Sequence, residues 1–235
     1  MNVGIMQPYL FPYIGYFQLI NAVDTFVIYD DVAFIKRGWI NRNRLRLDRA
    51  VRSFTVPLAD ASQNRRIRET QVALGPYEQF RKKFFATSDN YYSKSAFYRQ
   101  TRPILADVFD PQPTTIADMA RHSIEVVCRY LGIPTRIVPS STIYNNCALK
   151  KAERLIDICR REHADTYINP AGGKELYTKG EFSKAGIELW FLESSTIEYR
   201  QIGGGEFIPN LSIIDVMMNN SADTIRQFLT QYELI

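Results

Sequence analysis

The sequence has few of the residues that build disulfide frameworks and metal sites. It contains three cysteines and two histidines in 235 residues. Cys128, Cys147 and Cys159 are odd in number and form no CxxC pair, which argues against a disulfide framework and against a zinc knuckle. The two histidines lie far apart in the sequence, so no metal site is expected.

The sequence also lacks a basic leader, a small-residue cleavage site and an uninterrupted apolar run long enough to span a bilayer. We therefore expect a cytoplasmic protein without membrane insertion. The formal net charge of +4 is dilute for a nucleic-acid-binding protein, although basic residues gather between Lys36 and Arg68. This segment either binds phosphate groups or forms a solvated sheet face. We do not expect nucleic acid to be the partner.

The composition is that of a packed globule, with 46% hydrophobic and 13% aromatic residues. The length fits one large domain or two small ones. No repeat, low-complexity tract or long linker interrupts the chain. We predict a single α/β domain over residues 1–235, with residues 32–110 as an insertion or subdomain.

Hydrophobic patterning predicts a strand, a helix and a second strand within the first 30 residues. This βαβ unit favours a mostly parallel central sheet flanked by helices, with a β-rich and helical insertion. The first loop of such a unit is a common ligand site. The later elements are β-rich segments at 32–47 and 51–58, helices at 76–109 (broken near 89–95), 115–131, 149–162, 212–218 and 222–232, and strands at 135–138, 166–169 and 188–192.

The first polar segment, Gln7 to Tyr16, lies between the first strand and the first helix, where helix N–H groups favour an anion. Gly15 permits close approach of a ligand. Core packing is the simpler role for Leu10, Phe11 and Phe17. The residues proposed to bind substrate here are Gln7, Tyr9, Tyr13 and Tyr16.

The second segment starts with Asp30 and Asp31, at the carboxyl end of the second strand, and continues through Lys36 into the sequence WINRN. Carboxylates there can hold a hydroxyl or a proton in transit, and Lys36 supplies positive charge. Alternatively, the aspartates cap a turn and pair with Lys36 or Arg37. We predict catalytic roles for Asp30, Asp31 and Lys36. Trp39, Asn41, Arg42 and Asn43 are predicted to bind a sugar or nucleotide.

The third segment, residues 167–177, follows a short strand and contains Gly172 and Gly173, which free the backbone to cradle an oxyanion. It is not a nucleotide P-loop, because a required glycine and the Ser or Thr after the lysine are missing. A plain tight turn is the alternative. The candidate ligand residues are Asn169, Gly172, Gly173, Lys174 and Tyr177, and His122 is a further candidate base.

These segments resemble the WbqC-like family, through MQPYLFPYIGYFQLI, FVIYDDVAFIKRGWINRNRL, YINP with GGKELY, and FIPNLSIIDVMMNN. The resemblance spans nearly the whole chain in order. It implies a bacterial protein of O-antigen, lipopolysaccharide or other surface-polysaccharide biosynthesis that acts on an activated sugar. We therefore expect a transferase that modifies a nucleotide-linked amino-sugar, by acyl or aminoacyl transfer from an acyl donor or carrier. The sequence specifies no cofactor.

Two other functions stay open. Residues 13–16, YIGY, are similar in placement to the HIGH signature of nucleotidyltransferases and class I aminoacyl-tRNA synthetases, with tyrosines at both histidine positions. This likeness implies a nucleotide-binding architecture in which adenylyl transfer is lost or altered. The third possibility is a non-enzymatic module that binds nucleic acid or a polysaccharide complex. For the enzyme, we expect the tyrosine-rich bend, the twin aspartates and the WINRN sequence to converge on one hollow.

Overall fold

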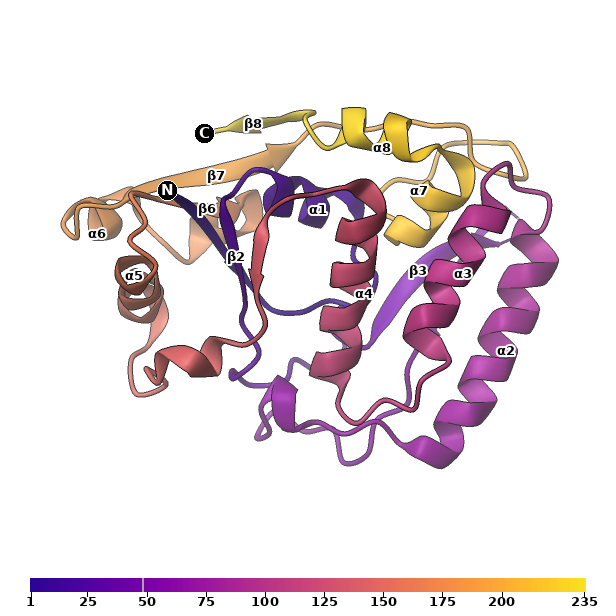
Figure 1. The fold of residues 1–235 in the computed structure, drawn as a ribbon, viewed down its shortest axis with the longest axis horizontal. Coiled ribbons are helices and arrows are strands. Elements are labelled where there is room, and N and C mark those ends of the chain that lie inside the picture. Colours follow the sequence, from indigo (N-terminus) through magenta and orange to yellow (C-terminus); the bar gives the residue numbers. More distant parts are fainter. Residues whose placement is uncertain (48) are drawn as a thin grey trace.

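The computed structural model describes residues 1–47 and 49–235 and contains a central six-stranded sheet with the order β5-β2-β1-β6-β7-β8 (Figure 1). Neighbouring strands run parallel, except that β8 is antiparallel to β7. The predicted α/β class with a mostly parallel sheet is therefore confirmed. The strands are β1 (Asn2–Met6), β2 (Thr25–Ile28), β5 (Arg136–Val138), β6 (Thr166–Pro170), β7 (Glu188–Ser194) and β8 (Tyr232–Leu234).

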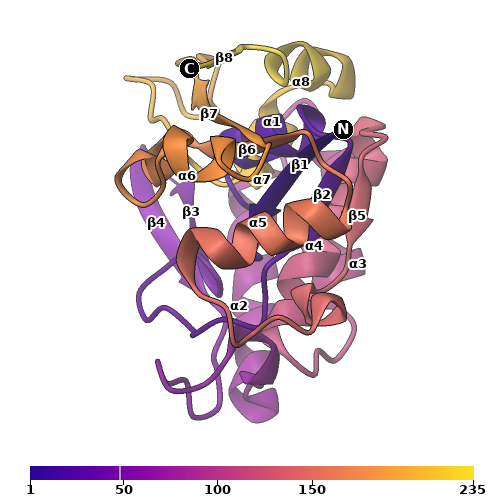
Figure 2. The ribbon, with the colours of Figure 1, turned by 90° about the vertical axis from the view of Figure 1, so that its left-hand side faces the viewer.

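Both faces of the sheet are buried, because side chains alternate between two hydrophobic clusters. Val3 and Ile5 of β1 pack in a cluster with helices α5 and α6, whereas Phe26 and Ile28 of β2 pack with α1, α4, α7 and α8. Figure 2 shows α5 and α6 in front of the strands, with α4 behind them. The helices are α1 (Ile14–Asn21), α4 (Ile116–Leu131), α5 (Lys151–Arg161), α6 (Lys179–Ser183), α7 (Ile213–Asn219) and α8 (Ala222–Phe228).

The strand order reverses direction between β1 and β6. Numbered by their order along the chain, the strands of this sheet read 3-2-1-4-5-6 across it. This is the order of dinucleotide-binding α/β folds, which bind ligands outside the carboxyl ends of the strands at the reversal. The loops after Met6 and Pro170 are therefore the place to search for a site.

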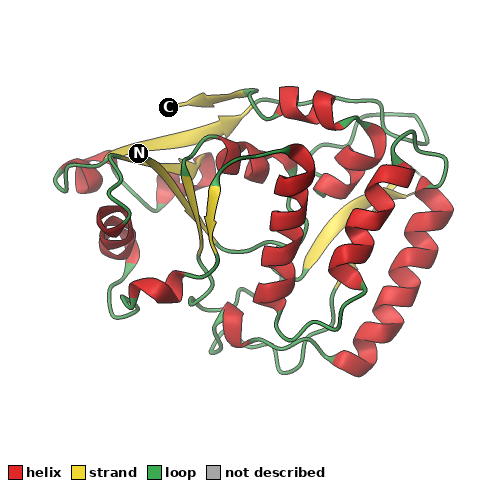
Figure 3. Ribbon diagram, in the orientation of Figure 1, coloured by secondary structure: helices red, strands yellow, loops and turns green. Residues whose placement is uncertain are grey.

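The segment over residues 32–110 forms a hairpin and two long helices (Figure 3). Strands β3 (Arg42–Leu47) and β4 (Ala50–Thr55) pair in a separate two-stranded sheet. Helices α2 (Leu74–Tyr92) and α3 (Tyr98–Phe109) follow, after the short 3-10 turn η1 (Ile67–Glu69). The rings of Phe84 on α2 and Phe109 on α3 are 4.6 Å apart, in the same cluster as α1 and α4. The segment thus packs onto one face of the sheet through a shared core.

Most predicted elements are present, but the chain end differs. The pattern over 222–232 was expected to be one helix, yet α8 ends at Phe228 and β8 follows. The short elements η2 (Ser141–Tyr144), η3 (Ala171–Glu175) and α6 were also not predicted. Within residues 1–47 and 49–235, no helix has the length and apolar character needed to cross a membrane.

Candidate functional site

The bend that links β1 to α1 is held in place by three distant segments. Phe11, at its centre, has a positive φ of 42°, a backbone angle that residues other than glycine rarely adopt. Its carbonyl oxygen accepts hydrogen bonds from Ser212 Oγ and Asn43 Nδ2, both at 2.7 Å. Its amide donates to Ser123 Oγ of α4 at 3.0 Å. The bend is therefore pre-organised by the surrounding fold.

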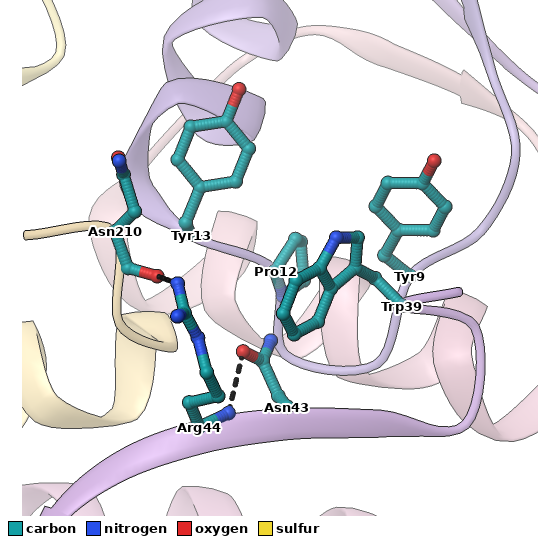
Figure 4. A pocket seen from close by; sticks show the side chains of 7 residues that line it. All are labelled: Tyr9, Pro12, Tyr13, Trp39, Asn43, Arg44 and Asn210. Carbon is teal, nitrogen blue, oxygen red and sulfur yellow. Dashed lines mark hydrogen bonds between the residues drawn. The ribbon is translucent and has the colours of Figure 1, made fainter. Parts of the chain in front are cut away.

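A cavity of about 330 Å³, here called the Trp39 pocket, opens between this bend and β3 (Figure 4). The Leu10 amide donates to the Trp39 carbonyl at 3.2 Å, which joins the bend to the WINRN sequence. The Trp39 side chain is 38% exposed, so its ring is accessible. The pocket is lined by Tyr9, Pro12, Tyr13, Trp39, Asn43, Arg44 and Asn210.

Two arginines give this aromatic pocket positive charge. The guanidinium carbons of Arg42 and Arg44 lie 5.5 and 5.1 Å from the centre of the Trp39 ring, within cation–π range. Arg44 also donates to the Asn210 carbonyl at 3.1 Å, which brings in a segment close to the start of α7. Flat aromatic rings beside a fixed positive charge suit a nucleotide, because its nucleobase can stack on the rings and its phosphates can pair with the arginines.

The tyrosines of the pocket are hydrogen-bond donors. Burial raises the pKa of Tyr9 and of Tyr13, so both phenols stay protonated at neutral pH. The observed position of the Tyr13 ring requires glycine at residue 15, because a Cβ atom on Gly15 would lie 2.4 Å from that ring. Gly15 thus lets the Tyr13 ring lie over the start of α1.

A second cavity, of about 350 Å³, lies at the carboxyl ends of β1 and β6 and is here called the switch-point cavity. Tyr9 lines both cavities, so the two adjoin at its ring. The switch-point cavity is lined by Ile5, Met6, Gln7, Tyr9, Tyr29, Ile35, Leu155, Tyr167, Asn169, Pro170, Gly172, Gly173, Leu176 and Tyr177.

Asn169 places a buried polar side chain at the switch-point cavity. It is only 5% exposed and lines the cavity. The amide lines the cavity and can both donate to a ligand and accept from it. Gly173 lies against it, because a Cβ atom there would be 2.2 Å from Asn169 Nδ2.

The twin aspartates lie behind the switch-point cavity, and neither lines it or the Trp39 pocket. Asp31 is 6% exposed and pairs with Arg154 Nη2 of α5 at 2.5 Å. Asp30 is 5% exposed and accepts a hydrogen bond from Ser140 Oγ at 2.7 Å, and burial raises its pKa. Both carboxylates make contacts within the protein, which connect β2 to the segment after β5 and to α5. The alternative expectation was that the aspartates pair with Lys36 or Arg37. Their side chains instead contact Ser140 and Arg154.

The aspartates still influence the cavity wall. The guanidinium carbon of Arg154 lies 4.8 Å from the centre of the Tyr29 ring, and Tyr29 lines the switch-point cavity. Asp31 thus orients Arg154, and Arg154 supports Tyr29. This chain of contacts gives Asp31 a positioning role.

The other two residues expected to be catalytic are also outside both cavities. Lys36 is exposed in the loop before Trp39. His122 lies on α4, where its Nε2 atom is 3.3 Å from the carboxylate of Asp107 on α3. This carboxylate was not evident from the sequence, because α3 and α4 meet only in the folded chain.

Four residues expected to bind substrate make contacts within the protein and line neither cavity. The buried Tyr16 hydroxyl donates to the Gln7 carbonyl at 2.8 Å, so of the YIGY tyrosines only Tyr13 reaches a cavity. Asn41 donates to the Val56 carbonyl at 2.8 Å. Arg42 donates to the Gly38 carbonyl at 2.9 Å, and Lys174 lies 3.9 Å from Glu193. The structure brings together, around the two cavities, Gln7, Tyr9, Tyr13, Trp39, Asn43, Asn169, Gly172, Gly173 and Tyr177.

Sequence reasoning missed Tyr29, Arg44, Tyr167 and Asn210 as cavity residues. Tyr29 directly precedes Asp30 at the end of β2, so the rule that drew attention to the aspartates applied equally to it. Arg44 directly follows the WINRN sequence. Asn210 is distant in sequence, and its signal was membership of the segment FIPNLSIIDVMMNN.

Comparison with known proteins identifies the family of the chain. The model of the WbqC-like protein family matches residues 7–227. A Mycobacterium tuberculosis (strain ATCC 25618 / H37Rv) protein named "Uncharacterized protein Rv1507c" is 31% identical over 225 residues, which cover 94% of this chain and 95% of that protein. No solved structure matches the chain. The bend, the WINRN sequence and the FIPN segment all lie within the matched range, and the chain belongs to the WbqC-like protein family.

Proposed function

We propose that the protein is a transferase that modifies a nucleotide-activated amino-sugar in bacterial surface-polysaccharide biosynthesis. The observation that carries this proposal is the meeting of two cavities at Tyr9, beside the reversal of strand order. Each cavity has the size of a small-ligand site. A nucleotide-linked sugar consists of a nucleoside and a sugar joined by phosphates, and a divided site of this kind suits it.

The distribution of charge favours one orientation of the ligand. None of the described residues that line the switch-point cavity has a carboxylate, ammonium, guanidinium or imidazole side chain, and their polar groups are tyrosine hydroxyls, backbone and the amides of Gln7 and Asn169. Such a lining suits a sugar whose hydroxyls both donate and accept hydrogen bonds, and it favours the neutral form of the sugar amine, which is the form that attacks an acyl carbon. The Trp39 pocket combines stacking surfaces with Arg44, which suits the base and the phosphates. We therefore assign the sugar to the switch-point cavity and the nucleotide to the Trp39 pocket.

The proposed reaction is acyl or aminoacyl transfer to the sugar amine. The amine nitrogen forms an amide with the acyl carbon of an activated donor such as a thioester, and the thiol leaves with the proton that the amine loses. In this proposal Tyr9 and Tyr177 donate hydrogen bonds, since burial raises the pKa of each phenol. Asp31 acts through Arg154 and Tyr29. Lys36 is exposed in the loop before Trp39, and in this proposal it approaches the phosphates.

Tryptophan fluorescence tests the binding step, because the chain has only two tryptophans, Trp39 and Trp190. In the Trp190→Phe variant, Trp39 is the remaining fluorophore, and we expect saturable quenching by uridine and thymidine diphosphate amino-sugars through stacking. The matched Trp39→Phe variant keeps Trp190 on β7, outside both cavities, and should show no quenching.

Mass spectrometry tests the transfer step. The purified protein, given a bound amino-sugar nucleotide and a panel of acyl and aminoacyl thioesters, should yield a sugar nucleotide heavier by one acyl group. Absence of quenching across the nucleotide panel would refute the assignment of the Trp39 pocket. Quenching without any acylated product would leave a binding protein and overturn the transferase.

A further inference from the structure

A third cavity lies away from both of these, between the β3–β4 hairpin and α2. Its volume is about 720 Å³, within the usual range for a site that encloses a small molecule. β3 connects it to the Trp39 pocket, because Asn43 and Arg44 line that pocket and Leu45 and Leu47 line this cavity. The lining consists of Leu45, Leu47, Arg52, Ser53, Phe54, Thr55, Pro57, Pro76, Gln79, Phe80, Lys83, Phe84, Thr87 and Ser88.

Half of the residues that line it are apolar, and three of these are phenylalanines. The Phe54 ring of β4 packs edge-on against Phe84 of α2, with centroids 5.1 Å apart, and Phe80 lies 5.9 Å from Phe84. Phe84 and Leu45 are buried, but Phe54, Phe80 and Leu47 remain partly exposed. Apolar surface left open to water in a concave site gains free energy when an apolar ligand covers it.

The charged residues of the cavity have one sign. Arg52 on β4 and Lys83 on α2 line it and are exposed, and none of the acidic residues within 1–47 and 49–235 lines it. Neither cation takes part in a salt bridge with a described residue. The cavity therefore offers positive charge from both of its walls, beside an apolar interior.

We propose that this cavity binds a single-chain amphiphile, with its aliphatic chain against Phe54, Phe80 and Phe84 and its anionic head between Arg52 and Lys83. A ligand that is polar throughout would leave those of its donors and acceptors that face the three phenylalanines without partners, which is unfavourable. A neutral apolar ligand would leave both cations without a counter-charge. The inference is independent of the sugar-nucleotide assignment, since the two sets of lining residues do not overlap.

Titration of the full-length protein with a dansyl-labelled undecanoic acid tests this site, with dodecanoate as the competitor. We expect saturable binding below the micellar concentration and displacement by dodecanoate. Thr87→Trp fills the cavity from α2 and should weaken binding more than about tenfold, by more than about 1.4 kcal/mol. The matched control is Ala86→Trp, an exposed neighbour that does not line the cavity and should bind as the wild type does.

Charge reversal tests the position of the head group. Lys83→Glu should weaken dodecanoate by about fivefold and leave dodecanol unchanged, because the neutral head loses no ion pair. Lys82→Glu, at an exposed neighbour outside the lining, controls for the change in net charge. Absence of saturable binding, or equal affinity for Thr87→Trp and Ala86→Trp, would overturn the proposal. So would displacement of the probe by apolar peptides but not by dodecanoate.

Discussion

Gly172 and Gly173 are adjacent in sequence, yet a methyl group meets different surroundings at each. A Cβ atom on Gly173 would lie 2.2 Å from Asn169 Nδ2, whereas one on Gly172 has no heavy atom within 4 Å. We predict that Gly173→Ala displaces the Asn169 amide and weakens sugar-nucleotide binding by about tenfold, the loss of about one hydrogen bond in a buried site. The measurement is the Trp39 fluorescence titration in the Trp190→Phe background.

Gly172→Ala is the matched control and should bind as the parent does. Thermal unfolding of both variants separates binding from folding, because Asn169 can rotate without disturbing the core. Equal affinities for the two alanine variants would contradict the role of Asn169. A large fall in the melting temperature of Gly173→Ala would instead mean that Gly173 is needed to fold η3.

At the level of single residues, sequence reasoning found side chains but not what they touch. It grouped Gly172 and Gly173 as one cradle for an oxyanion, although only Gly173 packs against a side chain. It placed Asp30 and Asp31 correctly at the end of β2, but their partners Ser140 and Arg154 are more than 100 residues away in the chain, with separations of 110 and 123. Contacts at that separation leave no local pattern.

At the level of elements, the hydrophobic period predicted the long helices and the buried parallel strands well. Helix α4 begins at the Thr115 cap and ends at Gly132 in the left-handed region, as the residues indicated. Strand β8 was missed because it has three residues and is defined by pairing with β7. The break between α2 and α3 was placed near 89–95 and lies between Tyr92 and Tyr98.

Asp215 joins α7 to α2 and to the loop between β7 and α7, and its burial predicts a pH effect. This α7 residue is 0% exposed and accepts hydrogen bonds from the hydroxyls of Tyr92 on α2, at 2.6 Å, and Tyr199, at 2.8 Å. Burial raises its pKa above the ordinary value of 3.8. The folded state therefore holds the proton more tightly than the unfolded state does, and this stabilisation is lost as the pH rises through the folded-state pKa.

We predict that the free energy of unfolding of the wild type, relative to Asp215→Asn, falls as the pH rises from below 3.8 to neutrality. Urea unfolding of both proteins across this range measures the difference and cancels the titration of other groups. Asp223→Asn, on exposed α8 surface, is the control and should show no such fall. A difference that is constant or rises with pH would contradict the raised pKa.

At the scale of the whole molecule, the basic residues between Lys36 and Arg68 do not form one surface. Arg46 is only 2% exposed, and its guanidinium donates to Gln201 Oε1 at 2.8 Å. Arg42 and Arg44 lie over Trp39 instead of facing outward as a patch. The sequence alone could not separate these roles, because arginines interleaved along a strand look alike whether they are buried or exposed.

The Trp39 pocket draws on both ends of the chain, from Tyr9 to Asn210, so a bound ligand should stabilise the entire fold. At one hundred times its Kd, a sugar nucleotide should add about 2.7 kcal/mol and raise the Tm by about 5 to 11 °C. Thermal unfolding at low and high salt measures this shift. A sugar nucleotide held by stacking and amides, with only Arg44 and Lys36 near its phosphates, should keep more of this shift at high salt than a nucleic acid held by many phosphate contacts, whose binding weakens steeply. A salt-sensitive Tm shift with single-stranded RNA, and none with sugar nucleotides, would favour the binding module over the transferase.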